Sequence, residues 1–241
     1  MRYAVPAPSS GNRPLVAVVI DDLGLDQART AEVIRLPGPL TLSFMTYAND
    51  LAHQTEMARR AGHELFLHVP MEAIDRREDP GPHGLFTSQT RDEILDRLRW
   101  GLGRFDGFVG VNNHMGSKFT ANAHSMAPVM EELRARGLVF LDSRTSPATS
   151  GIRLAAAYGV PHVARDVFLD DDQTPDAIAK QLARVEQIAR QHGSAIAIGH
   201  PHDTTIVALR IWLPQVDGKG LALVPVSAVV RRRMAEDETV H

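Results

Sequence analysis

Short, almost purely apolar runs alternate with segments of helical pattern along nearly the whole chain. The runs have the length of strands and consist largely of Val, Ile, Leu and Ala, as in residues 16–20 and 195–198. Strands that are covered on both faces of a parallel sheet have this composition. We expect strands at 15–20, 40–45, 64–68, 108–112, 138–141, 162–168, 195–199 and 221–226. The alternation therefore predicts an α/β fold built on a parallel sheet.

Helix signals occupy the connections between these runs. Thr90 and Glu93 form a capping box ahead of an apolar face at helical spacing. Further helices are predicted to begin at Asn122, at Thr174 with Pro175, and at Asp203, and weaker patterns predict helices at 26–35, 49–61 and 149–158. Seven or eight β/α units without an internal linker predict a closed or nearly closed (β/α) barrel of seven or eight parallel strands. A doubly wound open sheet is the alternative.

The length and composition fit one compact domain. The chain has 241 residues, of which 44% are hydrophobic and 23% are charged. We expect the barrel to span residues 14–230, between a linker or tail at 1–13 and a polar C-terminal tail at 231–241. The connection at 73–89 is long for such a fold, so it is expected to form a lid or a wall of the substrate site.

Several classes of protein are disfavoured by the same sequence. The formal net charge is -3 and no stripe of basic and aromatic residues is present, so nothing indicates nucleic-acid binding. The chain has no cysteine, which excludes disulfides and thiolate nucleophiles. No apolar stretch approaches the roughly 20 residues needed to span a bilayer, and the N-terminus lacks a signal-peptide pattern. The absence of a Gly-x-Ser-x-Gly turn argues against Ser-His-Asp catalysis.

Polar residues follow four of the predicted strands at their carboxyl ends. Asp21 and Asp22 end the first run, and His68, His114 and His200 end three later ones. Because parallel sheets and barrels bind ligands at this end of their strands, these side chains are expected to share one site. A carboxylate with two imidazoles can hold a divalent metal and leave room for a water. Asp22, His68 and His114 would supply such a set.

Five motifs in the same order resemble those of a known enzyme family. They lie at 20–24, 68–72, 112–117, 141–145 and 199–202, and the stretch Gly-His-Glu-Leu-Phe-Leu-His at 62–68 accompanies them. Over roughly residues 14–230 the chain is similar to polysaccharide deacetylases, the metal-dependent carbohydrate esterases that remove N-acetyl groups from chitin-like or peptidoglycan sugars. It looks more closely like their divergent polysaccharide deacetylase branch.

The resemblance implies a distorted (β/α) barrel and a bound metal, usually zinc. The first Asp of the family, its general base, corresponds to Asp21, and the second, a metal ligand, corresponds to Asp22. The histidine of the second motif corresponds to His68, and the late general acid to His200. The resemblance also implies an acetylated polysaccharide or amino sugar as substrate and a periplasmic or secreted location.

The chain departs from the family pattern at two places. The His-x-x-x-His of the family is His68-x-x-x-Glu72 here, and residues 112–117 replace an Arg-Pro-rich motif. We infer that His114 restores the third ligand from the neighbouring strand, and that Glu72 supports the site or is itself a weak ligand. The residues expected to orient the ligands or to contact substrate are Glu72, Asn113, Asp142, Ser143, Arg144, Asp166 and His202.

These supporting residues have different expected roles. Asp142 either orients a neighbouring group or caps a helix, and Asp166 is expected to orient a histidine. Ser143 and Arg144 are candidates for contacts with sugar hydroxyls. His202 is expected to cap the helix that begins at Asp203, with a role as the acid in place of His200 as the alternative.

Three functions fit these observations. The first is a metal-dependent hydrolase that removes N-acetyl or O-acetyl groups from a polysaccharide or amino sugar of the cell envelope. The second is an envelope protein that keeps the metal and binds carbohydrate with little or no turnover. A barrel phosphoesterase is a third, since Asp, His and Asn also suit metal-assisted phosphate chemistry. Asp21 and His200 favour the first function, because a binding protein needs neither a base nor an acid.

Overall fold

The computed structural model describes residues 1–240 of the chain and the side chains of residues 1–236. The strands are β1 (Leu15–Leu23), β2 (Thr41–Met45), β3 (Glu64–Met71), β4 (Phe108–Met115), β5 (Val139–Asp142), β6 (His162–Ala164), β7 (Val167–Phe168), β8 (Ser194–Gly199) and β9 (Ala222–Leu223). Eight of them form one sheet in the order β6-β5-β4-β3-β2-β1-β8-β7, and the short β9 pairs with β1. Every pairing is parallel, as the apolar runs predicted.

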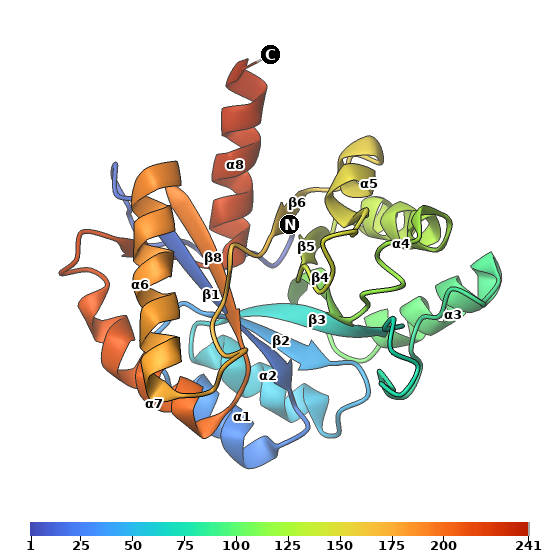
Figure 1. Cartoon of the computed structure of the whole chain (residues 1–241), viewed down its shortest axis with the longest axis horizontal. Helices are drawn as coiled ribbons and strands as arrows, with labels where there is room; N and C mark the ends of the chain where they lie inside the picture. Colours follow the sequence, from blue (N-terminus) through green and yellow to red (C-terminus); the bar gives the residue numbers. More distant parts are fainter. Residues whose placement is uncertain (241) are drawn as a thin grey trace.

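The helices lie around the outside of this sheet (Figure 1). They are α1 (Gln27–Ile34), α2 (Leu51–Arg60), α3 (Arg91–Leu102), α4 (Ala123–Arg136), α5 (Gly151–Ala157), α6 (Pro175–His192) and α7 (Asp203–Trp212), followed by a 3-10 turn at Leu213–Gln215 and by α8 (Val226–Val240). The predicted caps of α3, α4 and α6 are confirmed, because the side chains of Thr90, Asn122 and Thr174 each accept a backbone N–H of the first turn. No helix within residues 1–240 is long and apolar enough to cross a bilayer.

The two edges of the sheet are joined through two residues. The segment predicted as one strand at 162–168 is in fact two strands, since β6 pairs with β5 whereas β7 pairs with β8 at the other edge. Between them, the amide of Arg165 donates to the carbonyl of Asp142 (3.0 Å), and the amide of Asp166 donates to that of Ile196 (2.9 Å). The sheet must curl to bring these edges together, so the distorted (β/α) barrel is confirmed and the open sheet is wrong.

The alternation of side chains along the strands separates two apolar cores. One face packs against the outer helices, and the other fills the barrel interior with residues such as Val19, Phe66 and Ile198. Val226 and Val229 of α8 belong to the interior core. Full burial of each such side chain contributes about 1.5–3 kcal/mol, so α8 is an integral part of the barrel.

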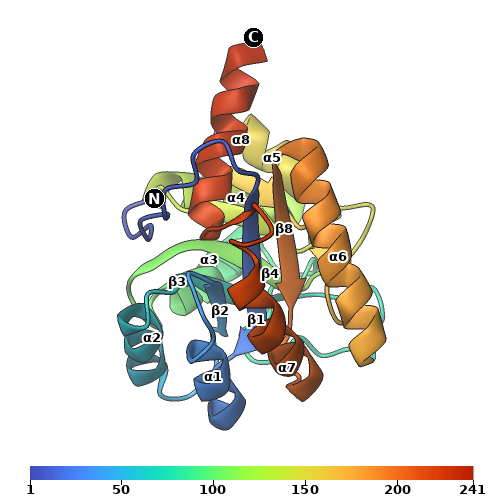
Figure 2. The ribbon, with the colours of Figure 1, turned by 90° about the vertical axis from the view of Figure 1, so that its left-hand side faces the viewer.

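Helix α8 closes the barrel at the amino ends of its strands (Figure 2). Its first amides donate to the first residues of two strands: Val226 N to Thr41 Oγ1 (3.0 Å) and Ser227 N to Glu64 Oε1 (2.9 Å). Residues 231–240, expected to form a polar tail, continue this helix, and the strand predicted at 221–226 is reduced to the two residues of β9. The carboxyl ends of the strands, where the polar motifs lie, are at the opposite mouth.

Candidate active site

A distortion at the end of β1 brings both aspartates into one site. In a regular strand, successive side chains point to opposite faces, so the alternation that buries Val19 inside the barrel also places Asp21 inside and would turn Asp22 outward. The pairing of β1 with β2 shifts register between Ile20 and Leu23, and Asp22 has a φ of 58°. Such irregularities re-aim side chains. As a result, His68 Nε2 lies 3.2 Å from Asp22 Oδ1 and 3.6 Å from Asp21 Oδ2.

Asn112 connects two of these groups. It is the register partner of His68 on the neighbouring strand, and its Oδ1 lies 2.9 Å from His68 Nδ1. Its Nδ2 donates to both oxygens of Asp21 (2.9 and 3.0 Å). Because an amide oxygen can only accept, His68 Nδ1 carries a hydrogen, and Nε2 is the ring nitrogen that faces Asp22. His114 follows two residues later on the same face of β4, with Nδ1 2.8 Å from Asp22 Oδ1.

Asp22, His68 and His114 fit a divalent metal. One ligand atom from each lies within 4.8 Å of the others. Neither imidazole contact has hydrogen-bond geometry, so the buried Asp22 Oδ1 has no hydrogen-bond partner among the described side chains. Burial by itself would raise the pKa of Asp22, but His114 and His68 hold it well below its usual range. An ionised carboxylate with an unsatisfied oxygen facing two imidazoles is the donor set that zinc prefers.

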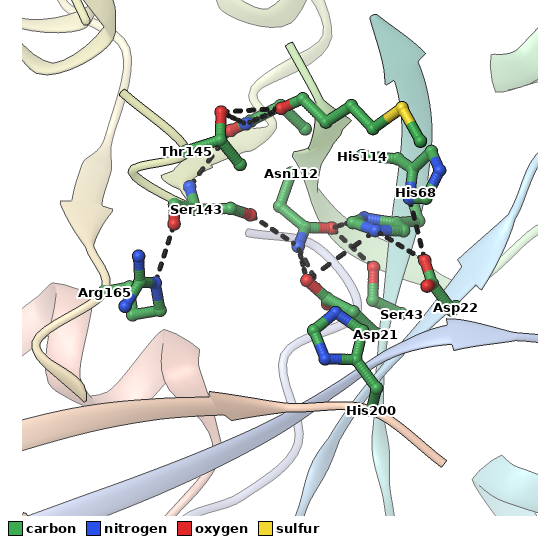
Figure 3. Close-up of polar contacts among 12 residues, drawn as sticks. Asp21, Asp22, Ser43, His68, Asn112, His114, Ser143, Thr145, Arg165 and His200 are labelled. Carbon is green, nitrogen blue, oxygen red and sulfur yellow. Dashed lines mark hydrogen bonds and ion pairs between the residues drawn. The ribbon is translucent and has the colours of Figure 1, made fainter. Parts of the chain in front are cut away.

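Asp21 and His200 lie beside this cluster (Figure 3). Asp21 is almost fully buried, and burial raises its pKa although the charges of His68 and His200 oppose the shift. His200 Nδ1 lies 3.0 Å from Asp170 Oδ1, and the amide of His200 donates to Asp170 Oδ2 (2.6 Å). Burial would lower the pKa of His200, but Asp170 and Asp21 together raise it to about 9. The site thus holds a buried carboxylate and an imidazole that keeps its proton at neutral pH.

These groups line one cavity of about 520 Å³. The predicted residues Asp21, His68, His114 and His200 contribute to its wall, and so do Asn113, Ser143 and Arg144. Of the long connection at 73–89, which was expected to form a lid or wall, Glu78 reaches the lining. A cavity of this size is within the range that binds a small ligand or one unit of a polymer.

The segment after β5 is shaped by hydrogen bonds to buried side chains. Asp142 accepts from the amide of Arg144 (2.8 Å) and from Thr149 Oγ1 (2.8 Å), so it orders this turn rather than capping α5. Asn113 Oδ1 accepts from the amide of Ser143 (3.0 Å), and Ser143 Oγ accepts from Asn112 Nδ2 (3.2 Å). The turn is thereby tied to the strand that carries His114.

Three predicted residues lie away from the cluster. Glu72 Oε1 accepts from Lys118 Nζ (2.7 Å) and Oε2 accepts from the amide of Thr87 (2.7 Å), and Glu72 is not among the side chains that converge with Asp22. Asp166 does not orient a histidine, because it accepts from the amide of Ile196 (2.7 Å) and from Arg233 (2.7 Å). His202 occupies the N-cap position of α7 without a side-chain capping bond.

Sequence reasoning missed Asn112, Asp170 and Arg165. Asn112 stands two residues before His114, and the period of two along a strand could have placed both on one face. Asp170 follows the predicted strand at 162–168 and has the position of the other strand-end groups. Arg165 lines the cavity because it lies where the chain crosses between the sheet edges, which no local signal reveals.

By fold, the protein is a barrel of the family 4 carbohydrate esterase type. The family 4 carbohydrate esterase from Streptomyces lividans, solved in complex with acetate, matches it with a TM-score of 0.53 at 15% identity, over 87% of this chain and 91% of that chain. The model of the divergent polysaccharide deacetylase family matches residues 18–230, and the chain belongs to this family.

Two relatives share more of the sequence. An uncharacterized protein from Agrobacterium tumefaciens has a TM-score of 0.92 at 34% identity, over 95% of this chain and 93% of that one. The uncharacterized protein YibQ of Escherichia coli is 37% identical over 198 residues, which are 81% of this chain. The chain spans 61% of the length of YibQ.

Proposed function

We propose that the protein is a zinc-dependent deacetylase that removes acetyl groups from a polysaccharide or amino sugar in the cell envelope. The observation that carries this proposal is the convergence, on one cavity, of a metal-compatible cluster with a buried carboxylate and a protonated imidazole. Family membership supports the acetylated carbohydrate as substrate. The envelope location rests on the family resemblance alone.

Asp22, His68 and His114 would hold the ion. When bound, a divalent ion supplies a Lewis acid for the acetyl carbonyl and lowers the pKa of a water. His68 is prepared for this role because Asn112 fixes the hydrogen on Nδ1, which leaves Nε2 toward the ion. The charges of Asp21 and Asp22 raise the pKa of His68 against the effect of burial, so a cation there would take the place of a proton.

Asp21 and His200 would divide the proton transfers. Asp21 accepts a proton from the attacking water, and its raised pKa makes it the stronger base. As the C–N bond of the acetamide breaks, His200 Nε2 gives its proton to the departing amine, and the products are acetate and a free amino sugar. Asp170 keeps the proton of Nδ1 in place throughout, because it accepts from that nitrogen.

Acetate release from N-acetylated chitin and peptidoglycan oligosaccharides tests the proposal, with zinc and with a chelator. We expect release with zinc only, and a decrease of about 10²–10⁴-fold in Asp21→Asn, the usual contribution of a general base. The variant should retain its zinc, since Asp21 is outside the ligand cluster. Saturable glycan binding without any acetate release would instead establish the alternative, a carbohydrate-binding envelope protein.

A further inference from the structure

One wall of the active-site cavity carries arginines without carboxylate partners. Arg165 is half-buried there, and its Nε and Nη2 donate to the backbone carbonyls of Ser143 (2.7 Å) and Arg144 (3.0 Å). Its guanidinium also lies 4.9 Å from the ring centre of Phe168, which in turn contacts His200. No carboxylate with a described side chain forms an ion pair with Arg144 or Arg165. Two backbone carbonyls therefore hold the guanidinium of Arg165, and its Nη1 has no hydrogen-bond partner among the described residues (Figure 3).

A second hollow, of about 680 Å³, adjoins this wall. It is lined by Arg144, Ser146, Pro147, Thr149, Ile152 and Arg153, so it shares Arg144 with the active-site cavity. Arg144 adopts a φ of 52°, a left-handed conformation held by the bond from its amide to Asp142. Non-glycine residues in this region concentrate at functional sites. Arg153, like Arg144, is exposed and forms no ion pair with a described side chain.

We propose that this second hollow is a subsite for a carboxylated sugar adjoining the one that loses its acetyl group. The inference rests on the proposed function, and it assigns the substrate to the acidic acetylated glycans. Arginine matches the planar carboxylate with two parallel hydrogen bonds. Asp21, Glu78 and Asp171 line the adjacent cavity, so their repulsion favours a monoanionic carboxylate over a doubly charged phosphate.

The three arginines have different places relative to the proposed carboxylate. Arg165, fixed next to His200, lines the active-site cavity. Arg144 lines both hollows, and Arg153 presents an exposed guanidinium group in the second one. Burial and the neighbouring charge of Arg144 lower the pKa of Arg165, although the charges of Asp21, Asp142 and Asp171 oppose the shift. A carboxylate bound across Arg144 would offset the repulsion between the two guanidinium groups and align the neighbouring sugar over the catalytic groups.

Equilibrium binding tests the inference without requiring turnover. The probes are an oligosaccharide that alternates N-acetylglucosamine with glucuronic acid, and the same oligosaccharide with every carboxylate methyl-esterified. We expect calorimetry on the zinc-loaded Asp21→Asn protein, in which turnover is slowed, to give about tenfold or tighter binding of the free acid, the usual strength of a charge-assisted hydrogen bond. Added salt should reduce the preference, because screening weakens exposed charge pairs.

Charge-removing variants locate the subsite. In Arg144→Gln and in Arg153→Gln, the dissociation constant of the methyl ester divided by that of the free acid should fall toward one. Arg184→Gln, on the exposed face of α6, removes the same charge elsewhere and should leave the ratio unchanged. The inference would be overturned if the acid and the ester bound equally well or if neither bound. It would also be overturned if both subsite variants kept the preference for the free acid. Acetate release from the same oligosaccharide by the parent protein tests the proposed function separately.

Discussion

Asn112 satisfies four charged or polar neighbours with one side chain. Its oxygen accepts from His68 and from Ser43, and its nitrogen donates to both oxygens of Asp21 and to Ser143 Oγ. The residue is fully buried, so no water substitutes for a lost bond. Asn112 therefore fixes the ring of His68 for the metal and the carboxylate of Asp21 for the base with the same amide plane.

Asn112→Ala is expected to lower zinc affinity by about 10- to 100-fold, the usual effect of removing a partner that orients a ligand. Competition with a coloured chelator measures this affinity. Asn113→Ala is the matched control, because Asn113 bonds the carbonyl of Met115 and the amide of Ser143 rather than a ligand. An equal loss in both variants would show that the effect is structural.

Asp170 is expected to set the upper pH limit of catalysis. The pKa of His200 is raised to about 9 in part by the charge of Asp170, and the acid works only while it keeps its proton. In Asp170→Asn the pKa of His200 falls, so the high-pH limb of the rate profile should move to lower pH. The measurement is acetate release against pH. Asp166→Asn should leave the limb in place, since Asp166 bonds Arg233 and Ile196.

At the scale of elements, α8 depends on a buried carboxylate. Glu64 is fully buried at the start of β3 and accepts from the amide of Ser227 in the first turn of α8. A carboxylate near a helix N-terminus is favourable, but loss of hydration outweighs this and raises the pKa of Glu64. The closure of the barrel thus contains a group whose ionised form costs stability.

The stability of Glu64→Gln relative to the parent should increase with pH. Because the folded pKa of Glu64 is raised above its usual 4.5, the folded parent binds more protons than the unfolded chain, and its stability falls as pH rises through that window. Glutamine keeps an acceptor for Ser227 and has no charge to bury. Urea denaturation from pH 4.5 to neutral pH measures the difference in the free energy of unfolding between Glu64→Gln and the parent. Glu56→Gln, exposed on α2, should run parallel to the parent, and parallel behaviour of Glu64→Gln would contradict the prediction.

At the scale of the molecule, the proposed ion joins β1, β3 and β4 across the barrel mouth. An ion present at about 100 times its dissociation constant stabilises the fold by about 2.7 kcal/mol, which raises the melting temperature of a chain of this size by about 5–10 °C. Thermal unfolding with zinc and with a chelator measures the shift. His114→Ala should abolish it, whereas His124→Ala, exposed on α4, should not. A full shift in His114→Ala would remove His114 from the ligand set.

Local sequence patterns were sufficient to predict the strands, the helices and part of the candidate site. Apolar runs identify parallel strands because a strand that is covered on both faces exposes no face to solvent. Capping residues mark helix starts because their hydrogen bonds lie within one turn. The carboxyl ends of such strands meet at one mouth of the barrel, so the sequence by itself groups Asp22, His68 and His114.

Only the tertiary structure decided the hydrogen-bond partners that depend on the register of strand pairing and on the closure of the barrel. His68 bonds Asn112 because β3 and β4 pair in that register, and Asp170 rather than Asp166 supports His200 because the chain changes sheet edges between them. The bulge that turns Asp22 inward is likewise a property of strand pairing. A sequence shows which side chains a strand end presents, but a shift of one residue reverses the face they occupy, and that shift is set by contacts far apart in the chain.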